Sequence, residues 1–381
     1  MMIPTTNQAL DRDPVEIACE TYDSALACYA EGKMSEAESL FFRALHLLET
    51  AEGPDSPDVA QVLMSLAALY EDRCEYGAAE QLYERSVRIM EQTVDTGDTD
   101  IERLRVQSWS CLGAMHRAQG RYEQAGELFR QALLSAEQSF GPDSEEAANV
   151  LNQLGMLGKY QGHFEEAAQY YHRALAILEA LFGAEHHTLA SLYHNLGGLE
   201  HARGRYVEGE PFARRSVEIR EQALGPDHVD VAADVAALAA LLDGQGKYDE
   251  AEALYQRALK IFEREYGTEH YEIAANLNNL AAIYQTRGDE AGAEALYRQA
   301  LRIKEKIFGQ DNVDVAMTVN NLAVLCQAQG RHNEAEMMFR RALEAFESSL
   351  GPEHPHVVIC RENHADLRQE MVEPSSAVTL F

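Results

Sequence analysis

The chain is short of positive charge. Only 32 of its 381 residues are lysine or arginine, against 63 aspartates and glutamates, which gives a net charge of −31. Binding to nucleic acid requires basic side chains that displace counterions from the phosphates, so this function is excluded. An anionic membrane surface is disfavoured for the same reason. A basic partner would be steered toward such a chain, although acidity can also serve solubility alone.

Long apolar runs and targeting segments are also missing. No stretch approaches the roughly 18 uninterrupted apolar residues of a membrane-spanning helix. The first residues, MMIPTTNQALDRDP, have neither the basic nor the apolar region of a signal peptide. The six cysteines are irregularly spaced and form no CxxC pair, which suits thiols buried singly in a reducing compartment. We therefore expect a cytoplasmic protein that does not contact membranes.

Enzyme motifs are missing as well. The sequence contains no GxSxG, HExxH, GKS or GKT string. Gly155, Gly158 and Gly162 do not follow a strand pattern, so they predict no nucleotide-binding loop. These absences disfavour catalysis and a bound cofactor.

What the sequence does contain is a repeat. Two sets of six glycines each advance in steps of 42 residues (162 − 120 = 42), and the sets are offset by 21 (141 − 120 = 21). The first set is Gly120, Gly162, Gly204, Gly246, Gly288 and Gly330, and the second is Gly141, Gly183, Gly225, Gly267, Gly309 and Gly351. A fixed period of this size is typical of a repeat array, in which each unit packs only against its neighbours.

Each unit predicts two amphipathic helices. Between Ala148 and Gly183, apolar residues recur three and four positions apart on either side of Gly162, which is a helical spacing. Gly162 suits a short turn between the helices, and Gly183 suits the end of the second helix. The junctions at 141, 225 and 351 read GPDS, GPDH and GPEHP, which combine a helix stop with a new helix start.

This template predicts an all-α protein of about eight helical hairpins and a C-terminal capping helix, whose outer face is polar. The predicted repeats lie near 14–52, 56–97, 101–141, 145–183, 187–225, 229–267, 271–309 and 313–351, and the cap lies at 355–371. We expect a single domain over 13–371, between flexible tails at 1–12 and 372–381.

The units resemble the tetratricopeptide repeat. Its signature places are occupied by Leu154, Gly155, Gly162, Ala167, Tyr171 and Ala174, and Trp109 lies at its first-helix tryptophan position. The 42-residue period and the strings LNNLA (277–281), VNNLA (319–323) and GPDHVDVA (225–232) are similar to the kinesin light chain variety. The resemblance implies a right-handed α-solenoid that acts as a non-catalytic scaffold. Such a scaffold binds a peptide or protein segment in its concave groove.

The resemblance also implies that the first helix of each hairpin lines this groove. Carried onto this chain, the groove residues are Asn149, Asn152, Gln153, His194, Asn195, Ala236, Ala237, Asn278, Asn279, Asn320 and Asn321. Asparagine is a poor helix former, so its recurrence needs a reason. A carboxamide offers a donor and an acceptor to the main chain of an extended peptide. The alternative is that these amides bridge adjacent repeats. Inner positions hold almost no Lys or Arg, which disfavours an acidic ligand.

Two irregularities occur between residues 205 and 240. Alanines replace the amides at 233, 236, 237 and 240. They form either an apolar patch for a hydrophobic anchor of the ligand or a repeat that drifted toward a good helix former. Pro211 lies inside an expected helix, where Gly209 also replaces the usual alanine, and predicts a kink or a late helix start. This is either a hinge or a tolerated defect.

Four histidines share one repeat position, namely His186, His228, His270 and His354. Successive ones fall about 10 Å or more apart, because they belong to neighbouring hairpins. One zinc ion reaches only about 2 Å to each ligand, so we expect helix-start roles and no metal site.

The leading functional hypothesis is an interaction scaffold for a protein or peptide that is basic or carries a hydrophobic anchor. The alternatives are a regulatory or sensor module whose curvature responds to a signal peptide, and a structural protein that self-assembles.

Overall fold

The computed structural model describes residues 13–94, 97–350, 352 and 354–372. The predicted tail at 1–12, most of the predicted tail at 372–381 and the junction glycine Gly351 lie outside the described residues. The contacts between Cα atoms divide the chain into two compact units, Met1–Ala184 (unit 1) and Glu185–Phe381 (unit 2). The single domain expected over 13–371 therefore stays a prediction.

All regular structure in the described residues is α-helical. Unit 1 contains α1 (Pro14–Ala30), α2 (Met34–Ala51), α3 (Pro57–Asp72), α4 (Tyr76–Gln92), α5 (Thr99–Ala118), α6 (Tyr122–Phe140), α7 (Glu145–Tyr160) and α8 (Phe164–Phe182). Unit 2 contains α9 (Leu189–Ala202), α10 (Tyr206–Leu224), α11 (Val229–Gly244), α12 (Tyr248–Tyr266), α13 (Tyr271–Thr286), α14 (Glu290–Phe308), α15 (Val313–Ala328), α16 (His332–Ser349) and α17 (Pro355–Val372).

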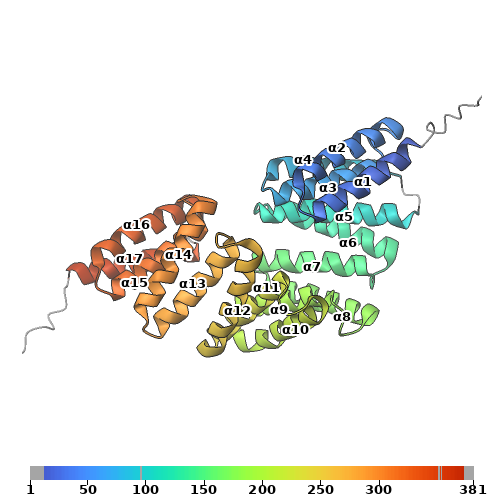
Figure 1. Ribbon diagram of the computed structural model, residues 1–381. Helices are drawn as coiled ribbons and strands as arrows, with labels where there is room; N and C mark the ends of the chain where they lie inside the picture. The colour runs from blue at the N-terminus through green and yellow to red at the C-terminus, as the bar shows by residue number, and fades with distance from the viewer. Residues whose placement is uncertain (1–12, 95–96, 351, 353, 373–381) are drawn as a thin grey trace, which may run out of the picture. The chain divides into compact units, whose positions relative to one another are not determined.

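The helices pair as the repeat predicts. Each odd-numbered helix from α1 to α15 packs against the even-numbered helix that follows it, which gives eight hairpins (Figure 1). The small residues of the repeat allow this close packing. A Cβ atom on Gly155 would lie 2.5 Å from the ring of Tyr171, so a side chain at this position would force the ring to move where α8 crosses α7. The all-α solenoid expected from the sequence is confirmed in each unit.

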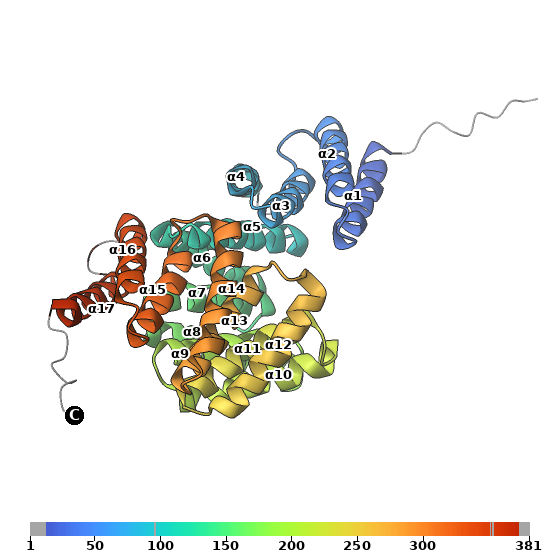
Figure 2. The ribbon, with the colours of Figure 1, turned by 60° about the vertical axis from the view of Figure 1, so that its left-hand side comes forward.

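The C-terminal helix closes unit 2. Figure 2 shows α17 at the end of the unit, where it lies against α15 and α16. Val357, Cys360 and Leu367 are buried in this contact. The residues expected to face outward (Arg361, Glu362, Asp366 and Arg368) are exposed. This polar outer face is what a capping helix needs, and the helix includes Val372, which had been assigned to the tail.

The shared histidine position starts helices. The Nδ1 atoms of His228, His270 and His354 each accept a hydrogen bond from the backbone N–H two residues on, at 3.2, 3.3 and 3.2 Å. Asn312, at the equivalent position, accepts one in the same way. The helix-start role is confirmed for these three histidines. His186 instead lies 3.0 Å from the Thr188 hydroxyl, and α9 begins only at Leu189.

Pro211 does not delay its helix. Of the two predicted outcomes, the late start is wrong, because α10 runs without a break from Tyr206 and contains the proline, and the kink stays a prediction. Pro211 lacks the N–H group that would have bonded to the carbonyl of Val207. Val207 is 67% exposed, so water can hydrate this carbonyl instead. Gly209 is required by packing, since a Cβ there would lie 2.7 Å from Leu241 Cδ2.

Candidate binding groove

One face of each unit is lined by the odd-numbered helices. Within unit 1 these helices also contact one another, α1 with α3, α3 with α5 and α5 with α7. Within unit 2 the same holds for α9 with α11, α11 with α13 and α15 with α17. First helices that meet across successive hairpins lie on the side where the hairpins are closest together, and we call this side the inner face. It is the face on which the sequence places the ligand.

The inner face of unit 1 carries two adjoining pockets. The α3–α5 pocket has a volume of about 830 Å³ and is lined by Glu52, Ser56, Pro57, Asp58, Gln61, Asp98, Asp100, Ile101, Arg103, Leu104 and Gln107. The α5–α7 pocket has a volume of about 250 Å³ and is lined by Arg103, Val106, Gln107, Ser110, Cys111, Glu145, Glu146, Asn149, Val150 and Gln153. Arg103 and Gln107 line both pockets, so the two pockets adjoin along α5, and together we call them the groove of unit 1.

Arg103 stands between the two pockets and is fully engaged in ion pairs. Its Nε donates to Glu146 at 3.0 Å and its Nη1 donates to Asp100 at 2.9 Å. The hydrogen bond to Glu146 is the main cause that raises the pKa of Arg103. The guanidinium also lies over the ring of Phe140, 5.4 Å from its centroid. Arg103 therefore links α5 to α7 and adds no free positive charge to the groove.

The predicted amides of α7 lie in or beside this groove. Asn149 is exposed, and Gln153 is half-buried with a buried Oε1 that has no hydrogen-bond partner. Asn152 is half-buried and does not line the pocket. The exposed carboxamide of Asn149 can bond to a ligand in the groove, whereas the buried oxygen of Gln153 faces the protein interior.

Sequence reasoning missed the matching residues of the preceding repeat. Gln107, Ser110 and Cys111 precede Asn149, Asn152 and Gln153 by one repeat each (149 − 42 = 107), and all three line the groove. The 42-residue step was the signal that could have found them. Burial raises the pKa of the Cys111 thiol to about 12, so this cysteine is a small apolar group of the groove wall rather than a nucleophile.

The asparagines of unit 2 partly bridge neighbouring helices, as the alternative interpretation expected. Asn278 Oδ1 on α13 accepts hydrogen bonds from Thr318 Oγ1 at 3.3 Å and Asn321 Nδ2 at 3.4 Å, both on α15. Asn279 is hydrogen-bonded to the buried Tyr255. Asn320 has a buried Oδ1 without a partner. Several amides in this unit therefore hold helices together, which leaves fewer of them available to a ligand.

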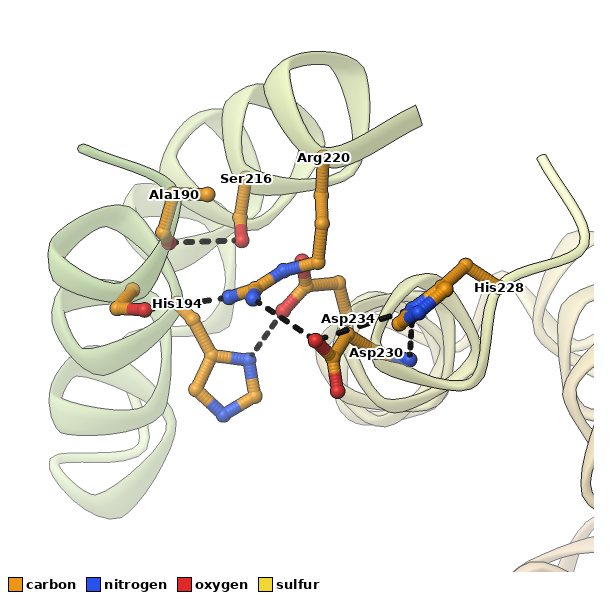
Figure 3. A network of polar contacts seen from close by, with 8 residues as sticks. Ala190, His194, Ser216, Arg220, His228, Asp230 and Asp234 are labelled. Carbon is orange, nitrogen blue, oxygen red and sulfur yellow. Dashed lines mark hydrogen bonds and ion pairs between the residues drawn. The ribbon is translucent and has the colours of Figure 1, made fainter. Parts of the chain in front are cut away.

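His194 belongs to a polar network on α9, α10 and α11 (Figure 3). His194 Nδ1 lies 2.7 Å from Oδ1 of Asp234, whose side chain is 1% exposed. Arg220 reaches between α9 and α11 and donates from Nε to Asp234 Oδ2 at 2.6 Å. Asn195, Ala236 and Ala237 are half-buried on the same inner helices. A buried carboxylate held by two cationic or polar groups serves primarily to hold the neighbouring helices in place.

This network revises the expectation that inner positions hold almost no Lys or Arg. Arg103 belongs to inner helix α5, and Arg220 enters from α10 at a position that is Leu178, Phe262 and Phe346 in other repeats. The sequence signal was a charge at an apolar core position, which requires a counterion. Both arginines are paired with carboxylates, so the inner face still offers no free cation at these positions.

Within the described ranges, no group of three or more His, Cys, Asp or Glu side chains is arranged to hold a metal ion. No helix there combines the length and the apolar character needed to cross a bilayer.

A family model described as tetratricopeptide repeat matches residues 17–92, 104–180, 188–261, 231–306 and 314–381. The chain belongs to the tetratricopeptide repeat family. A comparison with curated protein sequences gives no match.

Solved structures similar to this tetratricopeptide array include a signal transduction ATPase with a tetratricopeptide repeat sensor from Pyrococcus horikoshii. That similarity has a TM-score of 0.64 at 15% identity, over 96% of this chain and 51% of that one. A Rap protein complexed with Competence and Sporulation Factor has a TM-score of 0.58 at 13% identity, over 94% of this chain and 99% of that one. A set of nearly identical repeats designated kinesin light chain, from Podosopora anserina, has a TM-score of 0.45 at 21% identity, over 55% of this chain and 98% of that one. Identities this low describe the fold alone.

Proposed function

We propose that this tetratricopeptide array is a non-catalytic interaction module that binds an extended segment of another protein along its inner face. The observation that carries the proposal is the groove of unit 1, whose two adjoining pockets share Arg103 and Gln107. Its walls offer the exposed carboxamide of Asn149 and the partly exposed apolar side chains of Ile101 and Leu104. An extended peptide uses both kinds of contact, since its main chain needs hydrogen-bond partners and its side chains need pockets.

The charge balance supports a partner that is basic or carries a hydrophobic anchor. The chain has a net charge of −31, and Arg103 and Arg220 are already paired with carboxylates. An acidic segment would be repelled by this surface, whereas a basic one would be steered toward it. The half-buried Ala236 and Ala237 offer a second, shallow apolar surface in unit 2. A cytoplasmic location is part of this proposal, supported by six cysteines that form no disulfide.

A regulatory role is the second candidate. The specific observation behind it is that two of the similar structures, one with a tetratricopeptide repeat sensor and one complexed with Competence and Sporulation Factor, align over 96% and 94% of this chain. In that case the bound segment would be a signal that changes the state of the array, and binding would alter amide exchange far from the groove.

Site-specific crosslinking tests the proposed binding face. The photoreactive amino acid benzoylphenylalanine is introduced at Gln107, which is exposed and shared by both pockets, or at Gln124, which is exposed on the outer helix α6. In native cells we expect one protein to be crosslinked from position 107 and not from position 124. The double substitution N149A/Q153A should reduce that product. Equal capture from both positions, or no effect of the double substitution, contradicts the proposal.

A further inference from the structure

The α3–α5 pocket combines an apolar floor with an acidic rim. Ile101 and Leu104 of α5 form the floor, and both are partly buried against the core of the first hairpins. Glu52, Asp58, Asp98 and Asp100 stand around them. The pocket holds about 830 Å³, which is enough for a long side chain and its neighbours.

The rim carries more negative charge than the groove neutralises. Arg103 is the sole basic residue that lines this pocket, and it already serves both Asp100 and Glu146. Asp98 is used as the cap of α5, where it accepts from the Asp100 N–H. No hydrogen bond or ion pair involves the side chains of Glu52 or Asp58 among the described residues. Two carboxylates therefore face the pocket without a counterion.

A second observation shows that this negative field extends beyond the pocket. The pKa of the Cys19 thiol on α1 is raised by burial and, after it, by the carboxylates of Asp58, Asp23 and Glu52. These four residues come from three different parts of the chain, namely α1, α3 and the end of α2. Their charges are thus concentrated on one side of unit 1 rather than distributed along a single helix.

Helix-start preference explains only part of this cluster. Asp58 and Asp100 lie in the first turns of α3 and α5, where the helix dipole favours negative charge. Glu52 lies at the C-terminal cap of α2, where the dipole disfavours it. A carboxylate that local helix electrostatics opposes, beside a second one without a partner, indicates that the positive charge comes from another molecule.

We infer that the α3–α5 pocket binds a lysine or arginine side chain of a partner protein, next to an aliphatic residue of the same segment. The cationic head lies among Glu52, Asp58 and Asp100, while its methylene stem and the aliphatic neighbour cover Ile101 and Leu104. Long basic side chains bury their stems on apolar surface and keep the charge at a polar rim, which matches this pocket. The inference rests on the proposed function, because it names the chemistry of the segment bound in that groove.

A short labelled peptide tests the inference without knowledge of the natural partner. The probe is a fluorescent peptide with alternating arginine and leucine, and the comparison peptides carry glutamate and leucine, or arginine and serine. Binding to the full chain is followed by fluorescence anisotropy at low and high salt. We expect the arginine–leucine peptide to bind best and its affinity to fall with salt, because exposed charges are screened.

A charge-matched pair of variants locates the site. E52Q/D58N removes the two unpaired carboxylates of the pocket, and E91Q/E127Q removes two exposed carboxylates of the outer helices α4 and α6. We expect the first pair to weaken peptide binding about tenfold and the second pair to change it less than about twofold. Equal weakening by both pairs would overturn the inference, because it would reveal steering by net charge alone. Tight binding of the glutamate–leucine peptide would overturn it as well.

The apolar floor of the α3–α5 pocket provides an independent test of the inference. I101A should weaken the arginine–leucine peptide more than the arginine–serine peptide, with an unchanged helical circular dichroism spectrum. Equal losses for both peptides would contradict an aliphatic contact.

The inference and the proposed function can fail separately. If position 107 captures a partner whose binding is unchanged by E52Q/D58N, the inference is wrong and the proposed function stands. If position 107 captures nothing, the proposed function fails as well.

Discussion

Cys74 has a backbone conformation that does not suit its side chain. Its φ is +60°, and among the described non-glycine residues it alone is positive. The corresponding hairpin turns have glycine there, for instance Gly32 at +74° and Gly162 at +77°. A Cβ atom in this region is strained, and the exposed thiol contributes little packing in return.

We therefore expect Cys74→Gly to raise the free energy of unfolding by about 1 kcal/mol. The thermal unfolding midpoint of the full chain measures this effect. Cys74→Ala is the control, because it removes the thiol but keeps the Cβ atom. A gain of the same size in both variants would assign the effect to the thiol instead of the backbone.

Glu210 couples stability to pH. Its carboxylate accepts hydrogen bonds from Lys247 Nζ at 2.7 Å, Gln245 Nε2 at 2.9 Å and Arg214 Nε at 2.8 Å. These contacts, with the one to Lys247 first, lower the pKa of Glu210 from 4.5 to about 2. Since the folded state favours the charged form, this stabilisation is present above pH 4.5 and is lost as the pH falls toward 2.

Glu210→Gln should therefore destabilise unit 2 at neutral pH and have almost no effect near pH 2. Denaturant titrations across this pH range measure the difference from the wild type. Glu208→Gln serves as the control, because Glu208 is exposed on the same helix and forms no hydrogen bond or ion pair through its side chain with the described residues. A pH-independent effect of Glu210→Gln would show that the contacts act through packing rather than charge.

The start of α13 depends on the imidazole of His270. Its Nδ1 caps the Glu272 N–H, and its ring stacks on Tyr266 with the centroids 4.0 Å apart. We expect His270→Ala to cost about 1 kcal/mol and to speed amide exchange in the first turn of α13. His270→Asn should retain the cap, since Asn312 makes the same bond one repeat later. Identical amide exchange in His270→Ala and His270→Asn would show that the hydrogen bond of the cap does not stabilise the start of α13.

The proline in α10 is a local weakness of unit 2. Pro211 is exposed, so its replacement sacrifices no buried surface. Pro211→Ala restores one backbone hydrogen bond and should stabilise the chain by about 2 kcal/mol. In the wild type, amide exchange should be faster over 205–215 than over the equivalent 247–257. Equal exchange in both segments would argue against a hinge and against the expected gain.

The helices were readily predicted from the sequence, because each repeat supplies the same signals again. Apolar spacing, the turn glycines and the junction residues gave eight hairpins and a cap, and all are present in the described residues. The continuity of α10 through Pro211 was not predicted, since the carbonyl that loses its helical partner belongs to Val207, and the exposure of Val207 is set by the fold. Such effects arise between elements and leave no periodic pattern.

The groove was predicted in part. Asn149 and Gln153 lie in it, whereas Asn278 and Asn321 bond to each other between helices. The sequence pattern is the same whether an inner amide lines the groove or bonds to a neighbouring helix. Only the distance between neighbouring helices in the folded chain distinguishes the two situations. The pairing of Arg220 with Asp234 was missed, because the two residues lie on different helices and only the folded chain brings them together.

The two units should fold independently. The described core clusters around Phe41, Phe129 and Tyr83 lie within unit 1, and those around Phe262, Tyr255, Tyr297 and Phe339 lie within unit 2. We expect fragments 13–184 and 185–372, produced separately, to give helical circular dichroism spectra and cooperative thermal transitions. An unfolded fragment would show that the array needs its full length, as the prediction of a single domain implies.

Within each unit, the helix contacts of the described residues join neighbouring hairpins, which also bears on how such a gene can change. An in-frame duplication of 42 codons between Gly120 and Gly330, where the turn glycines keep this step, copies one complete hairpin and leaves the existing interfaces between neighbours of the same kind. A deletion of the same length does the reverse. Chains of this kind can therefore lengthen or shorten in whole hairpins, whereas most other indels would place core side chains in solvent.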